Sequence, residues 1–239
     1  MTQSKIYSTL TEWYSFVQSV ESCRKEGLYY RQLFQAESSA PPRTLLELGC
    51  GGGNTASYFK PELTLTLTDI SPQMLEVSRK INPGCEHILG DMRVLRLGRV
   101  FDIVFIHDAI MYMTSEEDLR QVIITAAVHC RPGGLLVIQP DCVRETYADG
   151  ANSEIGGHDE PDRAMRYMEW HFDPDPHDTH YEVHFAILLR RGNAADVEVV
   201  HDHHRYGLFS QETWLNLLRA AGFAGSLRKE HLTFVGRRL

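Results

Sequence analysis

A run of glycines directly after an apolar strand, of the kind buried in a sheet, is the feature that most constrains the fold of this chain. Residues 44–48 are almost continuously apolar and continue into Gly-Cys-Gly-Gly-Gly-Asn at residues 49–54. Glycine tolerates positive φ, and because it lacks a Cβ its backbone can lie at van der Waals distance from a ligand. A strand followed by such a loop and a helix start is typical of an α/β protein that binds a nucleoside or nucleotide.

Short apolar runs alternate with helix-like stretches through residues 41–139, as expected for a parallel sheet covered by helices. We therefore predict an α/β fold, with a Rossmann-like parallel sheet and flanking helices. The expected strands are residues 44–48, 63–68, 86–89, 101–106 and 135–139.

Helix boundaries support the same arrangement. A proline and two glycines at residues 132–134 are expected to end the second helix, and Gly222 to end the last one, which should cover the sheet edge. The expected helix starts are the Ser71-Pro72 N-cap, the capping-box spacing of Thr114 to Glu117, and Ser210.

Residues 163–206 contain three extended runs separated by turn sequences at residues 173–176 (Asp-Pro-Asp-Pro) and 191–193 (Arg-Gly-Asn). We expect an antiparallel β insert after the fifth strand. Ligands of open α/β sheets bind beyond the carboxyl ends of the strands, so this insert is well placed to cover that crevice. The predicted organisation is one domain, residues 1–239, with a cofactor-binding core at 41–141 and a substrate-covering insert at 142–209.

Charge and cysteine usage exclude several classes of partner. The formal charge of −8 disfavours nucleic acid, because binding phosphates requires Lys and Arg. The five cysteines are scattered and lack C-x-x-C spacing, which fits a reducing cytoplasm. No apolar run approaches the roughly 20 residues of a membrane helix. We expect a cytoplasmic protein with a small-molecule substrate and no nucleic-acid or membrane partner, and we leave a homodimer open.

An acid in the expected place indicates a nucleoside ligand. Asp69 ends the second predicted strand, 22 positions after Glu47, where a carboxylate can accept hydrogen bonds from both ribose hydroxyls. The alternative is a structural glycine turn with a helix-capping Asp. NAD enzymes use a similar loop but require a third glycine at the place where Asn54 stands.

The succession of motifs along the core resembles that of class I S-adenosylmethionine-dependent methyltransferases. The motifs are Glu47-x-Gly49-x-Gly51-x-Gly53, Asp69, Gly90-Asp91-Met92, Phe101-Asp102-Ile103-Val104 and Pro132-Gly133-Gly134-Leu135. The region after the core is also loosely similar to bacterial deoxyaminosugar N,N-dimethyltransferases, in its layout and in the Leu-Phe-Ser at residues 208–210. This similarity favours a small polar acceptor.

The resemblance implies S-adenosylmethionine as the cofactor and suggests residues that hold it. It implies that Gly49, Gly51 and Gly53 lie beside the methionine moiety, Asp69 holds the ribose, Asp91 meets the adenine amino group, Ile70 and Met92 sandwich the adenine, Glu47 lies near the loop, and Tyr14 touches the methionine carboxylate. Three alternatives remain open, namely a turn role for Asp91, core packing for Met92 and helix packing for Tyr14.

The end of the fourth strand supplies the catalytic candidates, His107 and Tyr112, and His107 is also expected to face the cofactor. Methyl transfer is an in-line displacement, so positioning of the acceptor can provide much of the rate. A base is needed only if the acceptor is protonated or a poor nucleophile. The alternative is that His107 caps a strand end and Tyr112 only packs.

Histidines are abundant in the predicted insert, and imidazole is the commonest transition-metal ligand. They are His171, His177, His180, His184, His201, His203 and His204. Although His201 and His203 would share one strand face, no carboxylate or cysteine set completes a recognisable tetrad. We expect no metal site.

The resulting functional prediction is S-adenosylmethionine-dependent methyl transfer to a small-molecule acceptor, with an amine nitrogen favoured over oxygen. A non-catalytic cofactor-binding module and an NAD-dependent oxidoreductase are the alternatives from other classes. Direct comparison of dinucleotide and S-adenosylhomocysteine binding would separate them.

Overall fold

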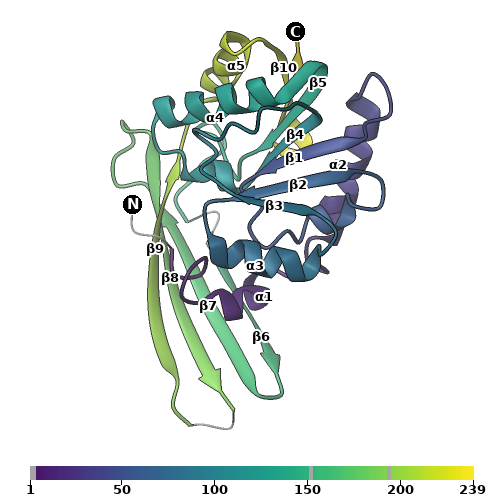
Figure 1. Ribbon diagram of the computed structural model, residues 1–239. Coiled ribbons are helices and arrows are strands. Elements are labelled where there is room, and N and C mark those ends of the chain that lie inside the picture. Colours follow the sequence, from purple (N-terminus) through teal and green to yellow (C-terminus); the bar gives the residue numbers. More distant parts are fainter. Residues whose placement is uncertain (1–3, 151–152, 193–194) are drawn as a thin grey trace.

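The computed structural model describes residues 4–150, 153–192 and 195–239, so Asn193 of the second predicted turn lies outside the described residues. Its central sheet contains β1 (Thr44–Leu48), β2 (Thr64–Asp69), β3 (Glu86–Leu89), β4 (Phe101–His107), β5 (Cys130–Gln139), β10 (Phe223–Arg228) and β11 (Thr233–Arg238). The strand order is β10-β11-β5-β4-β1-β2-β3 (Figure 1). Strands β1 to β5 pair in parallel, which confirms the Rossmann-like sheet.

Two features of this sheet differ from the prediction. The antiparallel hairpin β10-β11, which pairs with β5, was not foreseen because glycines interrupt both of its short apolar runs. Strand β5 begins at Cys130, where it pairs with Phe101, so the Pro-Gly-Gly at residues 132–134 lies within the strand rather than at a helix end. An irregularity in the pairing with β4 accommodates these residues.

Helices cover both faces of the central sheet (Figure 1). Those on one face are α2 (Arg24–Glu37) and α3 (Pro72–Ile81), and those on the other are α4 (Glu116–His129) and α5 (Gln211–Ala220). Each face of the buried strands therefore packs against a helical layer, which explains why β1 and β4 read as almost continuously apolar.

Three serine side chains cap these helices, and two of them were predicted. Ser71 accepts a hydrogen bond from the backbone of Met74 with Pro72 at the first helical position, and Ser210 accepts one from Thr213. The predicted cap at Thr114 is wrong by one position. Ser115 is the N-cap of α4, and its hydroxyl oxygen accepts the Asp118 backbone N–H at 3.1 Å.

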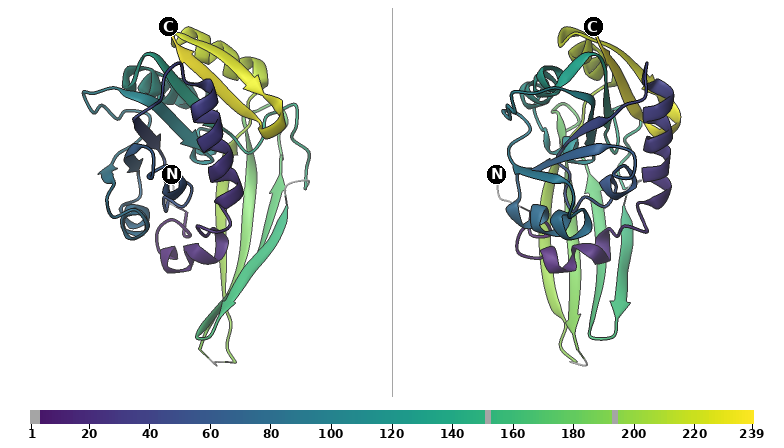
Figure 2. Two further views of the ribbon diagram at one scale, coloured as in Figure 1. Left: turned by 90° about the vertical axis from the view of Figure 1, so that its right-hand side faces the viewer. Right: turned by 45° about the vertical axis from the view of Figure 1, so that its right-hand side comes forward.

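The insert is a second sheet in which β6 (Glu154–Glu160), β7 (Arg163–Phe172), β8 (His180–Arg191) and β9 (Glu198–Gly207) pair antiparallel in that order. The antiparallel insert after the fifth strand is thus confirmed. Strand β6 was not predicted, because its glycines and acids have low β propensity. The long strands extend well past the central sheet (Figure 2).

The two faces of the insert sheet have different surroundings. On the inner face, Met165 and Tyr167 are buried against an N-terminal segment that contains η1 (Thr11–Trp13) and α1 (Tyr14–Val17). The outer face is open, with Trp170 53% exposed. Alternation along the strands therefore gives one buried and one solvent-facing surface.

The points where the insert leaves and rejoins the core are tied together. The backbone N–H of Arg144 donates to the carbonyl oxygen of Phe209 at 3.0 Å, and its guanidinium donates to the carbonyl of Leu208 at 3.1 Å. The insert is consequently anchored at one place beside the end of β5. Across the described residues, we find no helix with the length and apolar character needed to cross a bilayer.

Candidate active site

The glycine loop after β1 turns sharply at the carboxyl edge of the sheet. The φ angles of Gly49, Gly51 and Gly53 are 77°, 53° and 68°, a region that side chains other than glycine rarely adopt. The N–H of Gly49 donates to the carbonyl oxygen of Thr68 at 2.8 Å, which ties the loop to β2. The loop conformation therefore depends on the glycines foreseen from the sequence.

The members of this loop face different neighbours. A Cβ on Gly53 would collide with Ser78 of α3, so this glycine allows the loop to pack against the helix. A Cβ on Gly52 would lie 2.5 Å from the ring of Tyr14, which is buried on α1. A Cβ on Gly51 would meet only the ends of flexible side chains. Tyr14 thus packs directly over the loop, while Gly51 has the most space beside it.

Asp69 joins the glycine loop to the start of α3. Its carboxylate accepts the N–H of Gly51 on one oxygen and the N–H of Ser71 on the other, both at 2.8 Å. Burial raises the pKa of Asp69, and these backbone donors oppose that increase. Each carboxylate oxygen retains acceptor capacity beyond its single backbone bond. The geometry therefore leaves Asp69 able to accept further hydroxyl donors.

The residues suggested for the adenine lie just after β2 and β3, and one of them has a partner that was not predicted. Ile70 is 62% exposed, and the half-buried Met92 places its methyl group 3.0 Å from where a Gly49 Cβ would lie. The carboxylate of Asp91 accepts the Arg93 guanidinium at 2.6 Å, and this partner lowers the pKa of Asp91. Sequence reasoning did not anticipate the ion pair, which holds Asp91 in place while occupying part of its acceptor capacity.

Glu47 is a buried acid beneath the loop. Glu47 is only 2% exposed, and its Oε2 has no hydrogen-bond partner among the described residues. Burial raises the pKa of Glu47 to about 8, although the nearby His107 acts in the opposite direction. A buried oxygen without a partner is unfavourable unless a ligand group supplies a donor, so Glu47 fits a position beside a bound polar group.

His107 lies at the end of β4 on the α2 side of the sheet. Its Nε2 is 2.8 Å from Glu26 Oε1 and 3.3 Å from Asp108 Oδ1. Burial alone would lower the pKa of His107, but these carboxylates outweigh it and raise the pKa to about 9. The imidazole is therefore cationic at neutral pH and is poorly suited to accept a proton.

Tyr112 belongs to a different hydrogen-bonded group on the insert side. It ends η3 (Ala109–Tyr112), and its hydroxyl lies 2.7 Å from His204 Nδ1. The other ring nitrogen of His204 lies 2.8 Å from Ser4 Oγ and 3.2 Å from Asp202 Oδ2. Burial raises the pKa of Tyr112 well above its ordinary value, so the phenol stays neutral. The chain Asp202–His204–Tyr112 fixes the direction of this hydroxyl.

Three carboxylates lie near both His107 and Tyr112. We name Asp108, Asp141 and Glu169 the acidic recess, since they come from the ends of β4 and β5 and from β7 of the insert. Asp141 is solvent-exposed at the end of β5, and desolvation by the surrounding protein together with the nearby charges of Asp108 and Glu169 raises its pKa well above the ordinary value. The negative charges of Asp108 and Glu169 therefore oppose ionisation of Asp141, as expected for like charges placed close together.

Sequence reasoning missed Asp141, Glu169 and the nearby Tyr7. Only Asp141 carried a usable signal, because it follows Pro140 just after β5, at the edge where ligands bind. Tyr7 and Glu169 reach the recess from the N-terminal segment and the insert, and only the tertiary fold brings them there. The rings of Tyr7 and Tyr112 meet edge to face, with centroids 6.1 Å apart.

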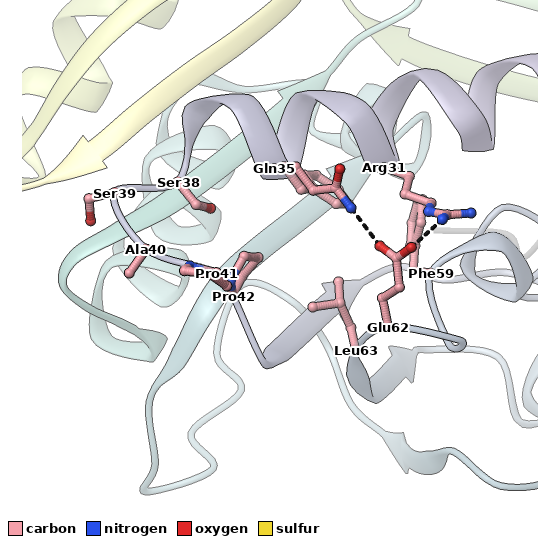
Figure 3. Close-up of a pocket in the computed structure, with 11 residues that line it drawn as sticks. Arg31, Gln35, Ser38, Ser39, Ala40, Pro41, Pro42, Phe59, Glu62 and Leu63 are labelled. Carbon is pink, nitrogen blue, oxygen red and sulfur yellow. Dashed lines mark hydrogen bonds and ion pairs between the residues drawn. The ribbon is translucent and has the colours of Figure 1, made fainter.

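A hollow lies at the amino ends of the parallel strands, opposite the glycine loop (Figure 3). It is lined by α2, the segment at residues 38–42 before β1, and residues just before β2. Within it Glu62 accepts a hydrogen bond from Gln35 at 2.7 Å and pairs with Arg31. Open α/β sheets bind ligands at the carboxyl ends of their strands, so this hollow is not the candidate active site.

Comparison with known proteins shows which family the chain belongs to. Residues 45–134 match the family described as a methyltransferase domain. The chain is 31% identical over 192 residues to the dTDP-3-amino-3,4,6-trideoxy-alpha-D-glucopyranose N,N-dimethyltransferase of Streptomyces venezuelae, an alignment that covers 79% of this chain and 77% of the relative.

Solved structures show the same architecture. The crystal structure of Streptomyces venezuelae DesVI matches with a TM-score of 0.79 and 25% identity, covering 90% of this chain and 91% of that one. The fold is also that of CalS10, an amino pentose methyltransferase from Micromonospora echinaspora, with a TM-score of 0.78, 22% identity and coverage of 90% and 91%. The chain belongs to the class I S-adenosylmethionine-dependent methyltransferases. Within that class it is similar to the deoxyaminosugar N,N-dimethyltransferases.

Proposed function

We propose that this enzyme methylates the amine nitrogen of a small deoxyaminosugar. The observation that carries the proposal is the acidic recess of Asp108, Asp141 and Glu169 at the carboxyl edge of the sheet. Carboxylates close to one another attract a protonated amine and repel an acceptor that is itself a carboxylate. The relatives named above, whose printed names describe methylation of aminosugar nitrogen, support the same acceptor class.

We propose that the cofactor lies along the loop and the end of β2. S-adenosylmethionine supplies an electrophilic methyl group when it is bound. Asp69 would accept the ribose hydroxyls, while Ile70 and Met92 would contact the adenine ring. Asp91 would reach the adenine amino group from its ion pair with Arg93. These roles are supported by the exposure of Ile70 and by the position of Asp69 against the loop.

The remaining predicted cofactor residues form the methionine end of this proposed site. Gly49, Gly51 and Gly53 would allow the loop to approach the methionine moiety, with Gly53 acting through its packing on α3. Tyr14 packs over the loop and Glu47 lies beneath it with an unpartnered buried oxygen. The positive charge of His107 suits a neighbouring carboxylate better than it suits general-base catalysis.

The acceptor must lose a proton before it can react, because an ammonium nitrogen has no free electron pair. A carboxylate of the Asp108–Asp141 pair can take that proton, and the Tyr112 hydroxyl, held by His204, can orient the resulting neutral amine. Transfer of the methyl group returns a positive charge to the nitrogen. The fixed carboxylates, including Glu169, stabilise this developing charge.

The test is methylation of matched acceptors with isotopically labelled donor. A panel of deoxyaminosugars, free and linked to dTDP, would be run beside counterparts that carry hydroxyl in place of amine, and NMR would locate the label. We expect label on nitrogen and none on the hydroxyl counterparts. Label on oxygen would overturn the amine assignment, and cofactor binding without turnover on any acceptor would favour a non-catalytic module.

A further inference from the structure

The outer face of the insert sheet carries a cluster of chemically reactive side chains that the proposed reaction does not use. It consists of Glu182 and His184 on β8 together with His201 and His203 on β9. Within each strand the two residues are two positions apart, so they point to the same side of the sheet. The register places His184 directly opposite His203.

Strand pairing supplies the carboxylate that the histidine spacing alone lacks. Glu182 is diagonal to His203, and its Oε2 contacts His203 Nε2. Ligand atoms of Glu182, His184 and His203 all lie within 4.8 Å of one another. His201 approaches from the other side, with its Nε2 2.8 Å from His184 Nδ1. Four potential ligands from two strands therefore converge on one patch.

We propose that this cluster binds one divalent first-row transition ion through His184, His203 and Glu182, with His201 as a fourth ligand. Imidazole nitrogen with one carboxylate oxygen is a ligand set that suits Zn²⁺, Ni²⁺ or Cu²⁺ rather than Ca²⁺ or Mg²⁺. His203 is 45% exposed in its side chain, so an ion can reach it from solvent. Phe172 stacks on His184 with ring centroids 5.4 Å apart, which limits the rotation of that ring.

One neighbouring charge opposes the cation and sharpens the test. The Arg205 guanidinium donates to Glu182 Oε1 at 3.0 Å and therefore adds a positive charge beside the cluster. The other oxygen, Oε2, is the one directed at His203 and is the proposed ligand. Removing Arg205 should strengthen ion binding, whereas removing a ligand should weaken it.

A bound ion would crosslink β8 and β9. At the same position, the other face of β9 carries a residue of the proposed acceptor site. His203 points outward, while the next residue, His204, is buried and holds the Tyr112 hydroxyl. Because the ion would bind the folded sheet better than the unfolded chain, it should also raise the thermal unfolding midpoint.

The experiment uses untagged, chelator-treated full-length protein and Zn²⁺ as the probe, followed by isothermal titration calorimetry. We expect one equivalent to bind, the H184Q/H203Q double variant to lose at least about a hundredfold in affinity, and R205Q to bind several times more tightly. His177→Gln, a matched exposed histidine in the turn before β8, should bind like the wild type. Circular dichroism in chelator checks that each variant is folded.

Replacement of Zn²⁺ by Co²⁺ gives an independent readout, because imidazole and carboxylate ligands change its visible absorption. That spectrum should appear in the wild type and in H177Q but not in H184Q/H203Q. Absence of stoichiometric Zn²⁺ binding by the wild type, or full binding by a folded H184Q/H203Q variant, would overturn the proposal. These measurements require no acceptor and are independent of the methylation assay.

Discussion

The two sides of the proposed active site are assembled in different ways. Most of the proposed cofactor side, including Glu47, the glycine loop, Asp69 and Ile70, comes from one stretch of β1, the loop and the end of β2. Tyr14 on α1 and the residues Asp91 and Met92 after β3 complete it. The acceptor side consists of Tyr7, Asp108, Tyr112, Asp141, Glu169 and His204, which come from the N-terminal segment, the core and the insert. The first depends mainly on local backbone conformation, and the second depends on contacts between distant segments.

This difference gives the two sides separate sensitivities. Positive φ angles at Gly49 and Gly51 and two backbone hydrogen bonds to Asp69 shape the cofactor side. Side-chain hydrogen bonds that span nearly the whole chain, such as Ser4 to His204, shape the acceptor side. Variants on one side should therefore leave the ligand affinity of the other side nearly unchanged, and the following experiments test that division.

The largest effect is expected for Asp69→Ala. The substitution would remove the two proposed charge-assisted ribose hydrogen bonds of about 1.5 to 3 kcal/mol each, so S-adenosylhomocysteine affinity should fall by about a hundredfold or more. Calorimetric titration measures this change. Asp159 on β6 forms an exposed ion pair with Arg166 on β7, so Asp159→Ala is the matched control and should keep full affinity. Unchanged binding by D69A would contradict the assignment of the cofactor side.

A smaller effect is expected for Asp141→Asn in the acidic recess. An asparagine amide cannot take a proton from the substrate amine as a carboxylate does, so kcat/KM should fall by about ten- to a hundredfold. S-adenosylhomocysteine affinity should change by less than about twofold. Steady-state kinetics and calorimetry on the same preparation provide both values. A parallel loss of cofactor affinity would show that the two sides are not separable.

Tyr112→Phe and His204→Gln should each lower kcat/KM by about tenfold, because the first removes the hydroxyl that orients the amine and the second removes the imidazole that holds it. Since the two residues act as one unit, the double variant should be little worse than either single variant. Tyr147→Phe removes a hydroxyl that bonds to Asp149 in the insert and serves as the control. Fully additive losses would argue against a shared orienting role.

The smallest expected change is in the thermal stability of the His107→Gln variant. The folded protein raises the pKa of His107 from 6.5 to about 9, so it retains a proton that the unfolded chain releases above about pH 6.5. The resulting stabilisation is fully present below that pH and is lost as pH rises through about 9. His107→Gln should therefore unfold at a lower temperature than the wild type near pH 6, by several degrees.

The gap between the H107Q and wild-type midpoints should close as pH approaches 9 and above. Differential scanning calorimetry across this range measures it. His87, half-buried on β3 against Ser78 of α3, has its pKa lowered by burial and provides a contrasting control, since H87Q should not reproduce this pH profile. A constant gap at all pH values would contradict the ion pairing of His107 with Glu26.

The sequence predicted the fold where local chemistry determines structure. Alternating apolar runs defined the five parallel strands, and Ser71 and Ser210 marked helix starts that the structure has at those positions. The hairpin β10-β11 and strand β6 escaped detection because pairing with a neighbouring strand, rather than propensity, stabilises them. Strands with an uninterrupted apolar or alternating sequence could therefore be predicted, including β3 at the sheet edge, whereas these glycine-containing strands could not.

The candidate site divides in the same way. Gly49 and Asp69 could be proposed from the sequence because a glycine loop follows one predicted strand and an acid ends the next. The positive φ of Gly49 and the backbone hydrogen bond from Gly51 to Asp69 agree with that local reasoning. The sequence also selected Tyr112, but its partner His204 was only one of many histidines in the insert. Glu182 could not be joined to the histidine cluster without the register of β8 and β9, since contacts across strands have no counterpart in linear spacing.

The hydrogen bonds that join the two ends of the insert have a consequence for how such enzymes diversify. Because Arg144 bonds to the carbonyls of Leu208 and Phe209, both junctions of the insert lie at one location on the scaffold. Segments with adjacent ends can be exchanged between homologous scaffolds with little disturbance of the surrounding chain. Recombination at these junctions would generate chimeras that keep one donor-handling framework and acquire a new preference for the molecule that is modified.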